Sequence, residues 1–481
     1  MSILIEGALV LTPDGLRPAS VLTTGPKIAA VAHTPDDIAA LRPHASETVD
    51  ATGHFLIPGL IDAHAHGYSP LLRGTENSLP LELWALYTVL YGRAFDAAAI
   101  QAAIMLGAAE RIRAGITGVI DHTPYVALWP DALAAHEATG LRVGYAAFLH
   151  DISDYDLLDL PLPPELASLA GGPPPLDAPL YAARFAELVQ AARAGSGRVT
   201  VQLGPNAPQR CTPAAWSLWR SLRDRHTVPV HIHLMETRAQ AMIGKRDWEG
   251  GLLAEMSRQH LLEPGLSCAH GIWLDEAERA SLAEAGATVV HNPASNLMLG
   301  SGAMNTLSYR KLGLNLALGT DSANTGGRAD LFEVMRLAMT LPRITTPDPA
   351  LWPRHAEVLA MATTNGAAVL GLAGHLGSIA PGQLADLALI RHTHASTLAP
   401  TQSIASLVQH ASPDTVDSTM VNGQWLMRNR ILLAFDETQT LANATTAMAD
   451  ITDRTRHALP ALDALVPGLM PLLASRMDRQ D

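Results

Sequence analysis

The residues from Phe55 to His66, FLIPGLIDAHAH, decide the fold of this chain. Their apolar run is typical of a strand buried on both faces, and we expect a strand over Phe55–Ala63. Side chains alternate along a strand, so His64 and His66 at its end are expected to share one face. Taken alone, such a pair of histidines is more often part of the core or the surface than of a functional site. Whether these two belong to a site depends on the residues at the ends of the other strands.

Seven further apolar runs follow, and Ala- and Leu-rich helical patterns lie between them. The expected strands cover Ile116–Asp121, Val143–Leu149, Val199–Leu203, Val228–Leu234, Leu266–Ala269, Thr288–His291 and Leu314–Gly319. The expected helices include Ala97–Ala114, Pro130–Thr139, Tyr181–Ala194, Pro213–Arg225 and Asp275–Ala285. Eight strands that alternate with helices predict an α/β fold, a (β/α)8 TIM-like barrel. An open doubly wound sheet is the alternative, but no Gly-x-Gly-x-x-Gly turn follows any strand to support it.

The two ends of the chain differ from its middle. Residues 1–54 read as short strands joined by tight turns, and the same pattern returns over Gly377–Ile390 and Thr419–Leu432. Asn422-Gly423 between two apolar runs is a strong hairpin signal. We therefore expect both ends to combine into a small β-sandwich beside the barrel. The expected division is 1–54 and 376–435 for the β-sandwich, 55–375 for the barrel and 436–481 for a helical tail.

Composition narrows the class of protein. The chain has 481 residues, 48% of them hydrophobic, and a formal net charge of −13. Nucleic acids and anionic membranes need a cationic surface, so neither is expected as a partner. Two cysteines and the absence of a recognisable signal sequence favour a reducing compartment, the cytoplasm. We expect a cytoplasmic enzyme that binds a small-molecule substrate and forms a homo-oligomer.

Polar residues gather at the ends of the expected strands. The fifth strand ends in His231-Ile-His233-Leu-Met-Glu236, the sixth in His270, and the eighth runs into Asp321. The carboxyl ends of barrel strands meet at one face, where barrel enzymes build their sites. Imidazole together with carboxylate is the ligand set of a zinc-class divalent metal. His231 also points inward by parity, and we expect it to support the site or to pack in the core.

Several motifs carry a family resemblance. PGLIDAHAH, LLRG, HLMET, HNPASNLMLGSG and GTDSA resemble the motifs of the amidohydrolase superfamily, in its mononuclear-metal branch of cytosine, guanine and S-adenosylhomocysteine deaminases and triazine (atrazine) hydrolases. The terminal motifs LGSIAPGQLADLALI and MVNGQWLMRNRILL resemble the small β-sandwich of that family. The resemblance covers the chain from residue 1 to about residue 435. It implies that one divalent metal ion is held by His64, His66, His233 and Asp321, with zinc favoured over iron, cobalt or manganese.

The resemblance also implies the chemistry. Binuclear relatives bridge two metals with a carboxylated lysine at the end of the fourth strand, but no lysine lies between Lys27 and Lys245. The expected activity is hydrolysis of a non-peptide C–N bond of a small molecule, of amide, urea, carbamate, thiocarbamate or amidine type. The alternative is strict deamination of a nucleobase-like or triazine ring with release of ammonia. The implied catalytic residues are Glu236 for proton transfer to the leaving nitrogen, His270 for stabilising charge, and Asp321 for accepting a proton from water.

One departure from the family pattern leaves the substrate open. Relatives carry Gly-Pro-His after the fourth strand, where this chain has Gly204-Pro205-Asn206. The candidate substrate-binding residues are Arg73, Trp84, Asn206, His291, Asn296, Asn324 and Arg328. The long connection Asp151–Pro179 is expected to cover the substrate as a lid, with an oligomer contact as the alternative. A catalytically inactive scaffold is disfavoured, since none of the implied metal ligands is lost. A metal-independent binding protein is a further alternative, which metal analysis of the purified protein would decide.

Overall fold

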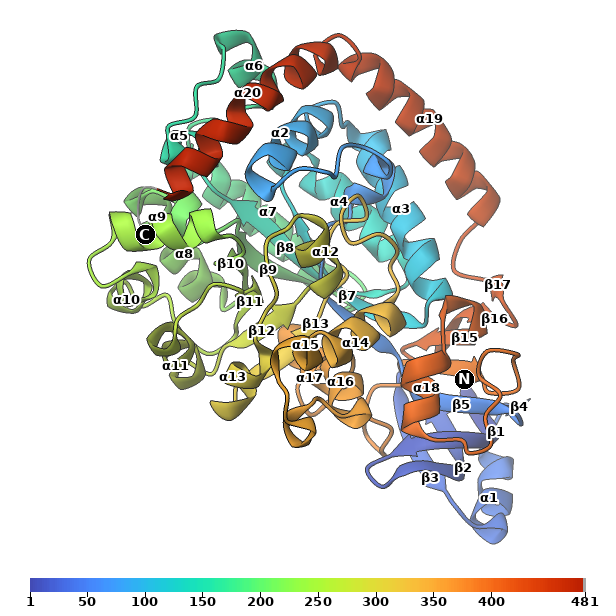
Figure 1. Cartoon of the computed structure of the whole chain (residues 1–481). Helices are drawn as coiled ribbons and strands as arrows, with labels where there is room; N and C mark the ends of the chain where they lie inside the picture. Colours follow the sequence, from blue (N-terminus) through green and yellow to red (C-terminus); the bar gives the residue numbers. More distant parts are fainter. Residues whose placement is uncertain (479–481) are drawn as a thin grey trace.

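The eight strands of the middle region form one parallel sheet, in which strands consecutive in sequence are neighbours. The computed structural model describes residues 1–478 and shows this sheet ringed by helices (Figure 1). The barrel strands are β6 (Leu60–Ala65), β7 (Ile116–Thr123), β8 (Arg142–Leu149), β9 (Val199–Pro205), β10 (Val230–Leu234), β11 (Leu266–His270), β12 (Thr288–His291) and β13 (Asn315–Leu318).

The sheet closes where its first and last strands meet. Ala65, the last residue of β6, forms a parallel bridge with Asp321, and the Asp321 amide donates to the His64 carbonyl at 2.9 Å. Gly319 makes this approach possible, because a Cβ atom there would lie 2.8 Å from that carbonyl oxygen and 2.4 Å from Asn292 Oδ1. The closed ring confirms the expected (β/α)8 barrel.

The run that opens the barrel is divided between two sheets. We expected one strand over Phe55–Ala63, but β5 (His54–Pro58) pairs with β1 and β14 in the terminal sheet, and only β6 belongs to the barrel. Pro58 has no N–H for a ladder, and a Cβ on Gly59 would lie 2.1 Å from Thr117. The chain therefore changes sheets at this Pro-Gly pair.

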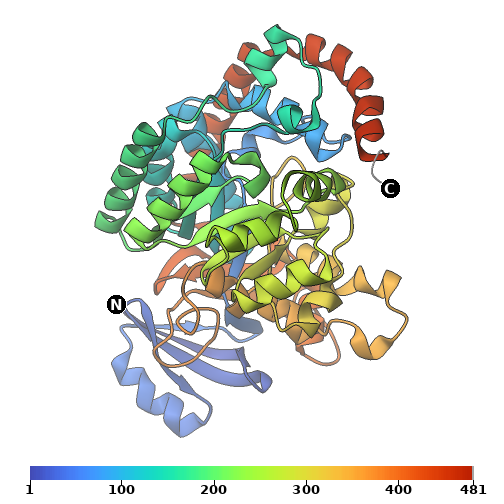
Figure 2. The same cartoon turned by 90° about the vertical axis from the view of Figure 1, so that its left-hand side faces the viewer.

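Both ends of the chain build a second, mixed sheet beside the barrel (Figures 1 and 2). Its order is β17-β16-β15-β14-β5-β1-β2-β3. The strand β4 pairs in parallel with residues 3–6 of β1. The expected hairpin at Asn422-Gly423 is confirmed, with both residues at positive φ. The strands not yet placed are β1 (Ser2–Thr12), β2 (Gly15–Thr24), β3 (Lys27–Ala32), β4 (Glu47–Asp50), β14 (Leu387–Arg391), β15 (Val416–Val421), β16 (Gln424–Arg428) and β17 (Ile431–Leu432).

Helices surround the barrel and cover one of its ends. Several begin at a side-chain cap of the usual kind; Asp96 accepts from the Ala99 amide and Thr212 from the Ala215 amide. The helices are α1 (Pro35–Leu41), α2 (Leu81–Gly92), α3 (Ala97–Arg113), α4 (Trp129–Thr139), α5 (Asp154–Leu158), α6 (Pro164–Ala170), α7 (Ala178–Ala194), α8 (Pro213–His226), α9 (Arg238–Asp247), α10 (Leu252–Arg258), α11 (Glu276–Glu284), α12 (Pro293–Met298), α13 (Thr306–Lys311), α14 (Leu331–Thr340), α15 (Pro342–Thr345), α16 (His355–Met361), α17 (Thr364–Val369), α18 (Ile404–His410), α19 (Glu437–Thr455) and α20 (Leu459–Asp478).

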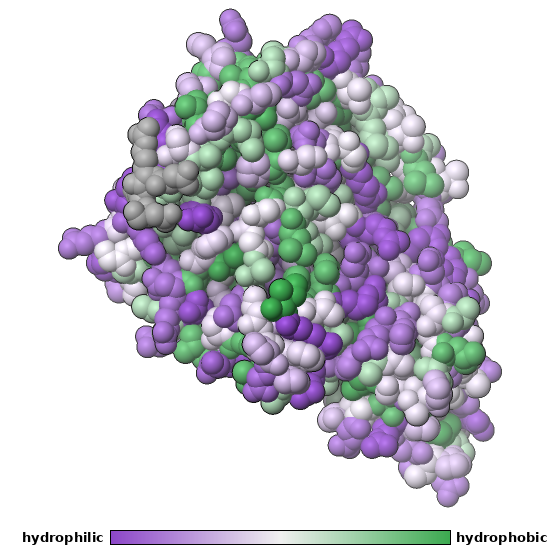
Figure 3. Space-filling model, in the orientation of Figure 1, coloured by the Kyte–Doolittle hydropathy of each residue, from purple (hydrophilic) through white to green (hydrophobic). Residues whose placement is uncertain are grey.

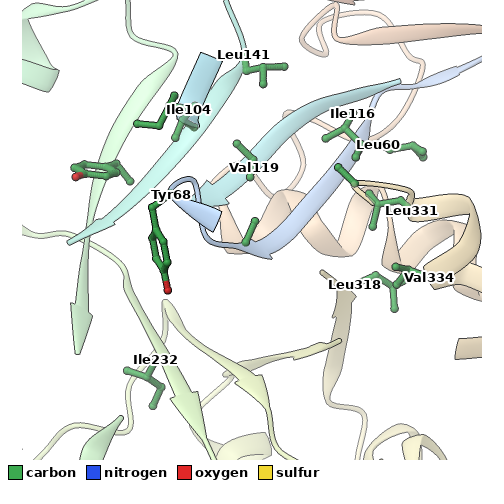
Figure 4. Close-up of a cluster of buried hydrophobic side chains, with 14 of the residues drawn as sticks. Leu60, Tyr68, Ile104, Ile116, Val119, Leu141, Ile232, Leu318, Leu331 and Val334 are labelled. Atoms are coloured by element: carbon green, nitrogen blue, oxygen red, sulfur yellow. The ribbon is translucent and has the colours of Figure 1, made fainter. Parts of the chain in front are cut away.

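Two apolar layers hold the barrel together. Outward-facing strand residues pack against the helices in one cluster; in Figure 4 Leu60 and Ile116 lie together on one side, and Val119 lies on the side of Ile104 from α3. Inside, small and branched side chains from five strands form a separate cluster whose outer end is covered by α17. Its strand members are Ile61, Ala63, Ile120, Ala146, Val290 and Ala317. The interior is therefore filled at one end, which leaves the other end for a site.

The tail of the chain arches over that other end. The helices α19 and α20 run across the top of the barrel in Figure 1, beside α3 and α2 respectively. Buried leucines of α20 pack with α2 and α5 in one apolar cluster. Among the described residues no single helix is long and apolar enough to span a membrane, although α2 with α3 and α19 with α20 pass a length and composition test as bent pairs.

Apolar side chains also reach the surface in places. Figure 3 shows them gathered over α12 and α15, where Leu297, Met298 and Ile344 are exposed. They alternate with polar groups over the rest of this face.

Candidate active site

Three histidines from two strands turn one nitrogen each toward a common point. The Nε2 atoms of His66 and His233 lie 3.3 Å apart, and those of His64 and His66 lie 3.4 and 3.3 Å from Asp321 Oδ1. Donor atoms around a tetrahedral ion with bonds of ~2.0–2.1 Å are themselves about 3.3–3.4 Å apart. These four side chains are all buried, and the His64 Nε2 atom has no hydrogen-bond partner among the described residues. The spacing therefore suits a metal ion.

The other ring nitrogens decide which atoms carry a lone pair. His66 Nδ1 lies 2.6 Å from the His122 carbonyl, and His233 Nδ1 lies 2.7 Å from the Asn206 carbonyl. A carbonyl only accepts, so both Nδ1 atoms carry the proton and both Nε2 atoms are free to bind a cation.

His64 also carries its proton on Nδ1, and a series of three hydrogen bonds determines this. Its Nδ1 lies 2.8 Å from His231 Nε2, and His231 Nδ1 lies 2.7 Å from Ser267 Oγ. The Ser267 hydroxyl donates to the Val230 carbonyl at 3.2 Å, so it accepts from His231. His231 in turn accepts from His64, and the His64 Nε2 lone pair remains free. Of the two roles expected for His231, support of the site or packing in the core, its hydrogen bond to His64 favours the first.

Burial keeps two of the three imidazoles in the neutral form that a metal ligand needs, and neighbouring groups decide the pKa of the other two side chains. Burial lowers the pKa of His64 to about 4 and that of His233 well below its usual range. At His66 burial is outweighed by Asp321 and by the His122 carbonyl, and the pKa is raised. Burial alone would raise the pKa of Asp321, but the His64 and His66 rings beside it hold the pKa of that carboxyl well below its ordinary value. The set thus combines imidazoles with an ionised carboxylate.

A carboxyl group and a fourth imidazole face these residues. His270 Nε2 lies 3.6 Å from Glu236 Oε2 and 3.8 Å from Asp321 Oδ2, while its Nδ1 is bound to Asn296 Oδ1 at 2.8 Å. Glu236 accepts from the Ser301 hydroxyl at 3.3 Å. Burial raises the pKa of Glu236 above its ordinary value, so this carboxyl holds a proton more readily than an exposed one. The pair can therefore exchange a proton with a ligand beside them.

Backbone geometry aims the side chains at this point. Met235, His270 and Asp321, at the ends of β10, β11 and β13, all have positive φ. This conformation is uncommon outside glycine and clusters at functional sites. The turns that follow the strands thereby direct Glu236, His270 and Asp321 inward.

The site is the floor of a large cavity. Its volume is about 1070 Å³, and His66, His233, Glu236, His270 and Asp321 line it. Aromatic side chains form much of the wall: Trp84, Phe95, Tyr125, Phe148, Tyr155 and Tyr181. The connection expected to act as a lid supplies α5, α6 and Gly171–Asp177 to the same lining. Arg93, directly after α2, holds this segment by donating to the carbonyls of Ser168, Gly171 and Gly172.

The candidate substrate-binding residues are scattered. Trp84 and Asn206 line the cavity. Asn296 lies behind His270 as its hydrogen-bond partner, and His291 and Asn324 are buried but absent from the lining. Arg73 pairs with Glu110, and the Arg328 side chain is largely exposed beside Asp330.

The sequence analysis overlooked His122 at the end of β7. Its Nε2 donates to the Gly204 carbonyl at 3.1 Å, its Nδ1 has no partner among the described residues, and its ring stacks on His66 and His233. Potential ligand atoms of His64, His122 and His233 lie within 4.8 Å of one another, as do those of His64, His270 and Asp321. The sequence pattern could have identified His122, because Asp121-His122 follows an apolar run just as His64 does.

A closed parallel barrel with histidines and an aspartate at the carboxyl ends of its strands defines a class, the metal-dependent barrel hydrolases. The comparisons agree with that class. Residues 55–426 match the model of the amidohydrolase family, and the chain belongs to this family. It is an enzyme that hydrolyses non-peptide C–N bonds of small molecules.

Two relatives illustrate the similarity. The 5′-deoxyadenosine deaminase of Methanothermobacter thermautotrophicus is 32% identical over 94% of this chain and 99% of its own. The 5-methylthioadenosine/S-adenosylhomocysteine deaminase of Pyrococcus furiosus is 32% identical over 83% of this chain and 90% of its own.

Solved structures share the fold. An adenosine deaminase from Xanthomonas campestris with bound zinc has a TM-score of 0.83 and 28% identity, and the match covers 94% of this chain and 98% of that one. The atrazine chlorohydrolase of Arthrobacter aurescens, solved with zinc, has a TM-score of 0.81 at 22% identity, with coverage of 93% and 100%.

Proposed function

We propose that this enzyme deaminates an adenine-type nucleoside without a phosphate group and releases ammonia. We also propose that one divalent metal ion, with zinc favoured, is held by His64, His66, His233 and Asp321. The observation that carries the proposal is the convergence of three Nε2 lone pairs and one carboxylate oxygen at spacings of 3.3–3.4 Å. The relatives named as deaminases of adenine nucleosides favour deamination over the amide, urea and carbamate alternatives.

The ion, when bound, supplies Lewis acidity and makes water a better nucleophile near neutral pH. The protein's own residues do the rest. Asp321 is ionised and accepts a proton from the attacking water. Glu236, whose pKa burial raises, delivers a proton to the nitrogen that departs from the ring carbon. His270 is fixed by Asn296 and hydrogen-bonds the oxygen that replaces that nitrogen.

The cavity supports a neutral, largely aromatic substrate. Its described lining contains two cationic side chains of the Lys/Arg type, Arg93 and Arg210, and no lysine. Arg93 is committed to three carbonyls and Arg210 to Asp154. A phosphate monoester would therefore meet no unpaired Lys or Arg side chain in the described lining, while a purine ring finds stacking partners on the walls.

Ammonia release tests the proposal. Zinc-loaded enzyme is incubated with adenosine, 5′-deoxyadenosine, 5′-methylthioadenosine and AMP, together with a panel of amides, ureas and carbamates. We expect ammonia from at least one uncharged nucleoside and little from AMP. Turnover confined to amides, ureas or carbamates would contradict deamination, and a preference for AMP would contradict the neutral-substrate argument.

A further inference from the structure

Four polar side chains on one wall of the cavity form an unbroken chain. His150 follows β8, Asn206 follows β9, Arg210 lies just beyond, and Asp154 begins α5 in the segment over the cavity. Arg210 donates from Nε to Asp154 Oδ1 at 2.9 Å and from Nη1 to Asn206 Oδ1 at 2.8 Å. Asn206 Nδ2 lies 3.3 Å from His150 Nδ1. All four residues line the cavity, and the mechanism above uses none of them.

The chemistry of the donors fixes every orientation along this chain. A guanidinium only donates, so the Asn206 atom that faces Arg210 must be its oxygen. The amide nitrogen of Asn206 therefore faces His150. Since an amide nitrogen also only donates, His150 Nδ1 must accept, and the proton of the neutral ring must sit on Nε2.

The remaining nitrogen of His150 is available to a ligand. Its Nε2 atom has no hydrogen-bond partner in the part of the chain that the structure describes, and the residue lines the cavity. Burial and the charge of Arg210 lower the pKa of His150 to about 4, so the ring is neutral at physiological pH. The wall thus presents one N–H donor whose direction is set by three other residues.

We propose that His150 is a specificity-determining residue, which donates a hydrogen bond from Nε2 to an acceptor atom of the bound nucleoside. Asn206, Arg210 and Asp154 are positioning residues that keep the proton on that nitrogen. This inference rests on the proposed function, because it takes the ligand to be an adenine nucleoside. The acceptor is either a ring nitrogen of the base or a hydroxyl oxygen of the sugar.

Steady-state kinetics with matched substrates tests the contact. H150F removes the donor and keeps an aromatic ring, and H410F, at an exposed position, is the control. The substrates are 5′-deoxyadenosine and its 3-deaza, 7-deaza, 2′-deoxy and 3′-deoxy analogues. We expect H150F to lower kcat/KM for 5′-deoxyadenosine about 3- to 10-fold, mainly through KM, as for one hydrogen bond between neutral groups. The analogue that lacks the acceptor atom should have a kcat/KM that is lower by the same factor in the wild type. H150F should turn over that analogue as well as the wild type does.

The outcomes separate the two proposals. A loss below about twofold in H150F, or an unchanged ranking of the analogues, overturns the role of His150. Failure of the wild type to release ammonia from every nucleoside overturns the proposed function.

The tautomer can be measured without turnover. ¹⁵N NMR of histidine-labelled enzyme, with H150F identifying the resonances, should show an unprotonated Nδ1 in the wild type. N206D replaces the donor by a carboxylate that accepts, so it should move the proton to Nδ1 or protonate the ring. The His233 contact uses only the main-chain oxygen of residue 206, so the zinc content should be retained. A proton on Nδ1 in the wild type would overturn the inference whatever the substrate.

Discussion

Ser267 has no direct contact with the proposed metal ligands, yet it determines which nitrogen of His64 carries the proton. S267A removes the acceptor of His231 and so frees the tautomer of His64. We expect metal affinity to fall about 10- to 100-fold, as is typical when a group that orients a ligand is lost. Competition with a chelator measures this, and S281A on the surface of α11 is the control. Equal affinities in S267A and wild type would contradict the relay.

Glu236 is expected to act in proton transfer and not in holding the fold. E236Q is nearly isosteric, so β10 and His233 should stay in place and zinc should be retained. We expect kcat to fall about 10²–10⁴-fold, with a smaller effect on KM. Steady-state rates and metal analysis measure both, with E249Q at an exposed position as the control. Near wild-type turnover in E236Q would assign the proton to another group.

For individual residues, the sequence predicts that the side chains at the strand ends converge. It does not predict the hydrogen bonds that orient these side chains. His64, His66, His233 and Asp321 follow strands of one barrel, so their meeting is a consequence of topology. The roles of Ser267 and Asn206 depend on hydrogen bonds between neighbouring strands, which no local pattern reveals.

The contact between α2 and the segment over the cavity should control substrate binding. R93M removes the donor to the carbonyls of Ser168, Gly171 and Gly172 but keeps a long side chain. We expect KM to rise with unchanged zinc content, because this segment lines the cavity. R184M on the exposed side of α7 is the control. Identical KM values in R93M and wild type would remove the support for a substrate-covering role.

Glu82 on the same helix links stability to pH. Burial raises its pKa from 4.5 to about 7, and its Oε1 accepts from Thr237 Oγ1 at 2.5 Å. A raised pKa in the folded state gives stability that is present below the unfolded pKa and is lost as pH rises toward 7. E82Q should therefore match wild type near pH 4.5 and be more stable than it at pH 8. Melting temperatures across this range test the effect, and a constant difference would contradict it.

Two features of the elements escaped the sequence analysis. The expected first strand is divided at Pro58-Gly59, because the apolar run continues through the point where the chain changes sheets. The pairing of β6 with β7 also shifts register between Asp62 and Ala65. Ala63 packs in the interior cluster, so strict alternation would turn His64 outward; the shift brings it inward. The prediction that His64 and His66 converge was right, but simple parity was not the whole reason.

For the molecule as a whole, metal removal should lower stability. The proposed ligands belong to β6, β10 and the end of β13, and a ligand that binds only the folded state stabilises it. We expect chelation to lower Tm and zinc to restore it, with H64A insensitive to both. An unchanged Tm after verified removal of the metal would argue against a shared site on these strands.

The homo-oligomeric state and the cytoplasmic location stay predictions.

The bridge between Ala65 and Asp321 also bears on how the enzyme is made. These partners are about 250 residues apart in sequence, and β5 waits still longer for its neighbour β14. Pairings so distant are slow to form, because the chain must lose the entropy of a long loop before any contact compensates. During synthesis on the ribosome, β5 and β6 therefore emerge long before β14 and Asp321, with which they pair. A nascent chain that stops short of Asp321 has neither a closed barrel nor a complete ligand set, so protection from proteases and zinc uptake should arise together, late in translation.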